Sequence, residues 1–92
     1  MTVTPEDVRN VLFDKPPLGR RGYSADDVDV LLDRIELALA GTVPMTAEEV
    51  RTVVFTKGTL TRRGYDEIQV DAFLDLVAAE LADATGRHES PP

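Results

Sequence analysis

Residues 63–75 read RGYDEIQVDAFLD, and residues 21–33 read RGYSADDVDVLLD. The same turn and helix start therefore occur twice, 42 positions apart. An ungapped alignment at this offset, begun at Thr4 and Thr46, covers 37 pairs, of which 18 are identical. Self-similarity at a fixed period is the sequence signature of repeated supersecondary units. We therefore predict that the chain is built from two copies of one unit.

Each copy begins with the signals for a short helix. Thr46 followed by Glu49 is a capping box, while Thr4 precedes Pro5 at the first helical position and Asp7 at the third. The apolar residues that follow recur at spacings of three and four, which predicts one apolar face over two turns. These residues are Val8, Val11 and Leu12 in the first copy and Val50, Val53 and Val54 in the second.

A loop and a longer helix complete each copy. Proline, glycine and threonine disfavour helix at residues 14–22 and 56–64, which we expect to be loops. The next helix starts are marked by Ser24 with Asp27 and by Asp66 with Gln69. An apolar stripe then repeats at the same steps and predicts an amphipathic helix. Its members are Val28, Leu31, Leu32, Ile35 and Leu39, and then Val70, Phe73, Leu74, Val77 and Leu81.

These elements predict a mainly α fold of two pseudo-symmetric repeats, with the two long helices packed together. Ordering about 80 residues costs on the order of 120 kcal/mol at about 1.5 kcal/mol each, so neither half is expected to be stable alone. We predict a single domain over residues 1–84, made of repeats at 4–40 and 46–82 joined by a linker at 41–45. Residues 85–92 are predicted to be a disordered tail.

The composition excludes several classes of function. The formal net charge of −7 opposes general nucleic-acid binding, because phosphates would be repelled by most of the surface. There is no cysteine, which rules out thiol redox chemistry and suits a reducing compartment. The first residues lack the basic start and apolar core of a signal peptide, and no apolar run approaches the ~20 residues of a membrane span.

The repeated motifs resemble a known family. Residues 50–55 (VRTVVF), followed by residues 63–75, look like the N-terminal module of the DivIVA family. The first copy carries the related run 8–13 (VRNVLF) and a loop at 15–23 (KPPLGRRGY) that is similar to the loop of actinobacterial members. Together the two matches cover most of residues 4–82.

The resemblance implies a cytoplasmic protein of cell division, polar growth or chromosome positioning, located at the septum, the pole or the inner face of the cell membrane. Family modules dimerise and touch curved anionic membrane through an apolar loop residue with basic neighbours. The matching membrane- or partner-binding residues are Leu18, Arg20, Arg21, Leu60, Arg62 and Arg63, and the matching turn residues are Gly22, Tyr23, Gly64 and Tyr65. We expect the family's long coiled coil to be absent, so that its intermolecular dimer becomes an intramolecular one.

No catalytic, cofactor-binding or metal-binding residue is predicted. The single histidine, His88, lies in the expected tail. Four aspartates are spaced four apart on the long helices, but carboxylates without histidine at that spacing usually form a solvated face. They are Asp29, Asp33, Asp71 and Asp75. We therefore expect no enzyme.

The basic loops leave two partner classes open. The four arginines Arg20, Arg21, Arg62 and Arg63 contribute about 1 kcal/mol each near an anionic surface, and partial burial of Leu18 and Leu60 adds on the order of 1.5 kcal/mol each. The total of about 7 kcal/mol, before entropy and acidic repulsion, gives only weak membrane binding.

We therefore favour a protein-interaction module that pairs with DivIVA-like or division proteins, with weak binding to anionic membrane as the alternative. Both a monomer with an intramolecular pseudo-dimer and a homodimer remain open. A purely structural role is also open, in which one arginine of each pair bridges to aspartates of the following helix.

Overall fold

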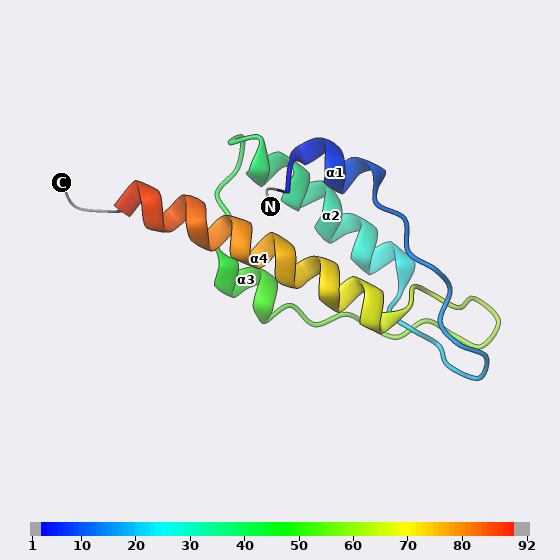
Figure 1. Cartoon of the computed structure of the whole chain (residues 1–92). Coiled ribbons are helices and arrows are strands. Elements are labelled where there is room, and N and C mark those ends of the chain that lie inside the picture. Colours follow the sequence, from blue (N-terminus) through cyan, green and yellow to red (C-terminus); the bar gives the residue numbers. More distant parts are fainter. Residues whose placement is uncertain (1–2, 90–92) are drawn as a thin grey trace.

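The computed structural model describes residues 3–89, and the side chains of residues 3–83. The fold is mainly α, as predicted (Figure 1). Its four helices are α1 (Pro5–Asn10), α2 (Ala25–Leu39), α3 (Ala47–Arg51) and α4 (Glu67–Glu89). Helix α1 packs on α2 and α3 packs on α4, which is consistent with two repeat units.

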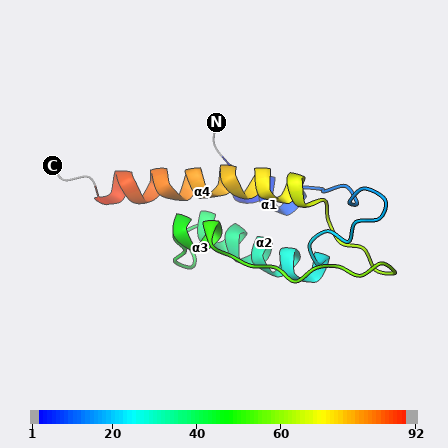
Figure 2. The same cartoon turned by 90° about the horizontal axis from the view of Figure 1, so that it is seen from below.

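The long helices α2 and α4 lie side by side and run in the same direction in both views (Figures 1 and 2). The segment between α1 and α2 and the segment between α3 and α4 both extend from the end at which α2 and α4 begin. The molecule is elongated, with principal-axis extents of 54 × 22 × 21 Å. The two loops therefore form one end of an elongated body.

One cluster of buried side chains forms the core. Its fully buried members come from both long helices, and burying a valine or isoleucine contributes about 1.5–3 kcal/mol. They are Val28 and Ile35 of α2 and Val70 and Val77 of α4. Val3 and Met45, which precede the short helices, are buried at equivalent positions 42 residues apart. The predicted stripes thus supply the core, although Leu32, Leu39 and Phe73 lie only partly buried at its edge.

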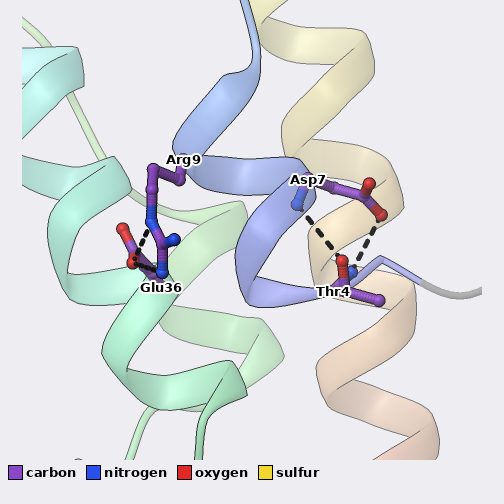
Figure 3. A network of polar contacts seen from close by, with 4 residues as sticks. All are labelled: Thr4, Asp7, Arg9 and Glu36. Carbon is purple, nitrogen blue, oxygen red and sulfur yellow. Dashed lines mark hydrogen bonds and ion pairs between the residues drawn. The ribbon is translucent and has the colours of Figure 1, made fainter.

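The start of α1 carries the complete capping box. Thr4 Oγ1 accepts from Asp7 N at 3.1 Å, and Asp7 Oδ2 accepts from Thr4 N at 3.0 Å (Figure 3). At α3, only the first of these bonds forms, from Glu49 N to Thr46 Oγ1 at 3.1 Å. The reciprocal capping box predicted at Thr46 and Glu49 is therefore wrong, and the box is complete at the other copy. Pro5 is the first residue of α1, as predicted.

Replacing both Thr4 and Asp7 with alanine is expected to lower the free energy of unfolding by about 1 kcal/mol, because the acceptor oxygens of both bonds of the box are then removed. Thr46→Ala with Glu49→Ala is the matched variant, and it is expected to cost about half as much because only one such bond forms there. Urea unfolding of the two variants checks the difference. Equal losses would contradict the role of the second bond.

The helix ends differ between the copies. Helix α2 stops at a turn in which Gly41 has φ +84° and Thr42 N donates to Leu37 O at 2.9 Å, a helix ending that favours glycine. Helix α4 continues to Glu89, so the backbone of residues 85–89 is helical where disorder was predicted. Residues 90–92 of that predicted tail lie outside the described residues. Among the described residues, no helix has the length and apolarity needed to cross a membrane.

Candidate functional site

The two loops cross each other at one end of the molecule, and we call residues 14–24 and 56–66 the crossed loops. The crossing is centred on Tyr23 and Tyr65, which form an isolated antiparallel bridge. Tyr23 N donates to Tyr65 O at 3.0 Å, and Tyr65 N donates to Tyr23 O at 2.9 Å. The backbone N–H and C=O groups of the two tyrosines therefore bind each other across the loops.

Two further backbone bonds flank this pair. Ser24 N donates to Thr56 O at 2.8 Å, and Asp66 N donates to Asp14 O at 2.9 Å. Donors and acceptors in these two bonds are related by the 42-residue offset of the sequence. Both bonds join the first half of the chain to the second. The residue before each long helix is thus held by the loop of the other half.

The tyrosine side chains repeat this reciprocal pattern. Tyr23 Oη donates to Asp71 Oδ1 at 2.9 Å, and Tyr65 Oη donates to Asp29 Oδ1 at 2.8 Å. The Tyr23 ring packs on Phe55 with centroids 5.0 Å apart, and the Tyr65 ring packs on Phe13 at 5.3 Å. Partial burial, followed by the hydrogen bond to Asp71, raises the pKa of Tyr23 to about 12. Partial burial, followed by the hydrogen bond to Asp29, likewise raises the pKa of Tyr65.

These shifts predict a loss of stability at high pH. Because the folded protein holds Tyr23 protonated above its ordinary pKa of 10.0, this contribution is complete below pH 10 and is lost as pH rises toward 12. Tyr23→Phe is expected to make the fall in unfolding free energy across that interval shallower. Chemical unfolding of the wild type and the variant at a series of pH values measures this fall. An equal dependence of the unfolding free energy on pH in both proteins would contradict the prediction.

Two polar side chains at the helix starts also reach across to the opposite loop. Asp27 Oδ2 accepts from Thr56 N at 2.9 Å and from Thr56 Oγ1 at 2.7 Å, which lowers the pKa of Asp27. At the equivalent place, Gln69 Oε1 accepts from Asp14 N at 2.7 Å and Gln69 Nε2 donates to Asp14 Oδ2 at 2.9 Å. The side chain of Gln69, predicted to complete a local cap, binds the opposite loop instead. Asp66 Oδ1 accepts from Ile68 N at 2.9 Å.

The predicted turn residues Gly22 and Gly64 lie where the two backbones approach most closely. Gly22 has φ +70°, a conformation that favours glycine. Gly64 has an ordinary φ, but a Cβ atom there would overlap the carbonyl oxygen of Tyr23. The glycines therefore serve the crossing of the loops as well as the local turn.

The tips of the loops carry the predicted apolar and basic residues. Leu18 is 91% exposed and Leu60 is 69% exposed. An open hollow of about 670 Å³ between the loops is lined by Arg20 and Arg21 of one loop and Lys57 of the other. Lys57 forms an ion pair with Glu67. The crossing thus brings apolar and cationic side chains of both halves to one end.

The arginines do not follow the predicted structural arrangement. Arg62 Nη2 lies 3.4 Å from Asp26 Oδ2, and Asp26 belongs to the helix of the other half and not to the helix that follows Arg62. Arg63 donates to the carbonyl oxygen of Pro16. Arg20 and Arg21 form no ion pair within residues 3–83. The first loop therefore presents its two guanidinium groups to solvent.

Sequence reasoning placed the loop tips but missed the contacts across the crossing. Asp14, Asp27, Thr56 and Gln69 were assigned to loops or local caps, and their partners lie 29 or 55 residues away. The signal that could have found the crossing is the joint repetition of tyrosine and aspartate at one offset. Asp29 and Asp71 accept tyrosine hydroxyls. Among the side chains that the structure describes, no group of three or more metal-ligating residues lies together.

Comparison with known proteins adds a partial similarity. A stretch of 36 residues, 39% of this chain, is 58% identical to the Cell wall synthesis protein Wag31 of Mycobacterium tuberculosis, of which it covers 14%. Wag31 of Mycobacterium leprae and of Mycolicibacterium smegmatis match over the same length at the same identity, with 14% and 13% covered. The chain therefore spans a small part of these relatives. No family model and no solved structure matches. What the comparisons establish is a one-module likeness to Wag31, a member of the DivIVA family.

Proposed function

We propose that this chain is a non-enzymatic protein-interaction module that acts as an accessory in bacterial cell division or polar growth. The observation that carries the proposal is the 58% identity over 36 residues with Wag31, a protein named for cell wall synthesis. The predicted loop motifs of the DivIVA family are the second support. The chain works without a cofactor, in the cytoplasm at the septum, the pole or the inner face of the membrane.

The architecture that suits this function is a pseudo-dimer within one chain. Equivalent bonds at the 42-residue offset, such as Tyr23 to Asp71 and Tyr65 to Asp29, support two repeats that exchange their contacts. Buried valines of α2 and α4 share one core, which supports packing of the long helices as partners. Each repeat already has its partner inside the chain. A DivIVA-like protein therefore binds the outer surface of the module rather than replacing one repeat.

The crossed loops supply that outer surface. Leu18 and Leu60 stand exposed on these loops, and Arg20 and Arg21 of one loop line a hollow together with Leu60 and Lys57 of the other. Arginine is enriched at protein interfaces and among the residues that carry most of the binding energy, and the exposed leucines add apolar area beside it. The predicted site residues are thus proposed to act together, as one bipartite patch.

Binding to purified full-length Wag31 tests the proposal. We expect immobilised chain to retain Wag31, and the variant with Leu18→Ser, Arg20→Glu, Leu60→Ser and Arg62→Glu to lose most of that retention, about tenfold or more in affinity. Leu37→Ser is the matched control, because Leu37 is exposed on α2 away from the loops. No retention of Wag31 by the wild type, or equal retention by the loop variant, would reject the proposal.

The second candidate is weak peripheral binding to anionic membrane. The specific observation that favours it is the exposure of Leu18 and Leu60 at a single cationic end. Sedimentation with phosphatidylglycerol vesicles at low salt distinguishes the candidates. Membrane binding predicts that the chain sediments and that the loop variant does not. Sedimentation that persists in the loop variant, or none at low salt, removes this candidate.

A further inference from the structure

A second apolar surface lies on the side of the molecule, away from the loop tips. It is a shallow groove between residues 11–14, which follow α1, and helix α4, and we call it the lateral groove. Its apolar lining residues are Val11, Leu12, Phe13, Ala72, Phe73 and Leu76. Leu12 is 91% exposed and Leu76 is 49% exposed. Two large aliphatic side chains from different halves of the chain thus face solvent within one hollow.

The lateral groove is not repeated on the other side of the molecule with the same chemistry. At the 42-residue offset, Leu12 corresponds to Val54, which is also exposed. Leu76, however, corresponds to Arg34, and a cation there interrupts the apolar surface. The internal symmetry that shapes the core therefore does not explain Leu76. Val30 and Val54 are exposed on the other side, but only the groove side continues its apolar surface through this leucine.

Carboxylates lie on the side of the molecule that carries the lateral groove, and their hydrogen-bond partners are uncharged. Asp14 lines the groove and accepts from the amide of Gln69, and Asp7, on the side of α1 toward α4, accepts from the backbone of Thr4 (Figure 3). Glu80, one helical turn beyond Leu76, accepts from Val3 N at 3.3 Å. None of the three forms an ion pair within residues 3–83. Their negative charge is therefore not neutralised by the chain itself.

The equivalent positions on the other side carry less negative charge. Asp7 corresponds to Glu49, while Asp14 and Glu80 correspond to the neutral Thr56 and Ala38. That side also carries Asp27 in place of Gln69, and Arg34 opposes its charge. The formal charges of Asp7, Asp14 and Glu80 on the groove side add up to −3. Those of Glu49, Asp27 and Arg34 on the other side add up to −1.

We propose that the lateral groove binds an amphipathic helix with one apolar face and lysine or arginine on its flanks, carried by the protein partner. This inference rests on the proposed interaction function and names the chemistry of a second contact with that partner. An apolar groove accepts side chains spaced three and four apart on a helix, and the carboxylate rim selects basic flanks. The acidic rim and the interrupted opposite side together favour this occupant over a second copy of the acidic chain.

A designed peptide tests the groove directly. The probe is a fluorescently labelled peptide of leucine and lysine, about five helical turns long, with leucines on one face. We expect the double variant Leu12→Ser, Leu76→Ser to weaken binding about tenfold, as read by fluorescence anisotropy. The matched control Val54→Ser, Val30→Ser alters the other side and leaves the affinity unchanged. Equal weakening by both pairs, or no binding by the wild type, would overturn the proposal.

The role of the carboxylates is tested with two double variants, each of which removes two negative charges from the chain. Asp14→Asn with Glu80→Gln is expected to weaken peptide binding about threefold or more, and Glu48→Gln with Glu49→Gln to have a smaller effect. Circular dichroism confirms that each variant is folded. Equal effects would show attraction to the acidic chain as a whole and would reject the groove.

The test is separate from that of the proposed function. The loop variant that loses Wag31 is expected to bind the peptide with unchanged affinity, because the lateral groove contains none of its four substitutions. Failure of Wag31 binding with intact peptide binding rejects the proposed partner alone. Loss of the peptide in the loop variant rejects the lateral groove.

Discussion

Gly64→Ala is expected to unfold most of the protein, or to lower its free energy of unfolding by on the order of 4 kcal/mol. The added Cβ would overlap the carbonyl oxygen of Tyr23 and lie 3.3 Å from Ala25 N. Both neighbours are backbone atoms, so no side-chain rotation relieves the overlap. The two loops would have to separate, and the tyrosine pair at 2.9–3.0 Å would be lost. The total free energy of unfolding of a domain of this size is only about 5–15 kcal/mol.

Gly41→Ala is the matched control for the glycine experiment. Gly41 has φ +84°, but a Cβ there meets nothing within 4 Å. Its replacement is therefore expected to cost only the backbone strain, about 1 kcal/mol. Urea unfolding followed by circular dichroism measures both variants. A loss at Gly64 no larger than the loss at Gly41 would mean that the loops do not cross as closely as described.

The sequence was sufficient for the long helices because their signals are local. The apolar face predicted for the short helices is wrong in part: α1 ends at Asn10 and α3 at Arg51, so Leu12 and Val54 lie beyond the helices and are 91% and 89% exposed. Spacings of three and four placed Val28, Ile35, Val70 and Val77 on one face, and all four are fully buried. The extent of α4 was predicted less well. The sequence predicts a disordered tail from residue 85, but the helix continues through Gly86 to Glu89, since glycine costs only about 1 kcal/mol inside a helix.

The crossing could not be predicted because it depends on pairs far apart in the chain. Asp27 carries the signal of a local cap, and Ser24 does accept from its backbone at 3.4 Å. Its carboxylate, however, binds Thr56, and no local rule distinguishes these two uses of one residue. The same holds for Arg62, whose carboxylate partner lies in the other half. The structure places the predicted Leu18 and Leu60 exposed on the loops, and their binding role stays a prediction, while the side-chain partners of the loop residues required the fold.

The two halves of the chain, made as separate peptides of residues 1–43 and 44–92, are each expected to be largely unfolded and to fold when mixed. Val28 and Ile35 lie in one half and Val70 and Val77 in the other, yet all four belong to one core. Separation exposes that core and leaves the backbone groups of Tyr23 and Tyr65 without their partners. Mixing restores both, at the cost of association entropy that the linker otherwise removes.

Circular dichroism against concentration measures this complementation. Each peptide alone is expected to show little helix, since short helices are marginal in water without tertiary packing. An equimolar mixture is expected to recover the helical signal of the intact chain, with a midpoint that shifts with concentration. The Gly64→Ala peptide is the control and should fail to complement, because it cannot accommodate the opposite tyrosine. Full helical content in either isolated half would show that contacts between the repeats do not maintain the fold.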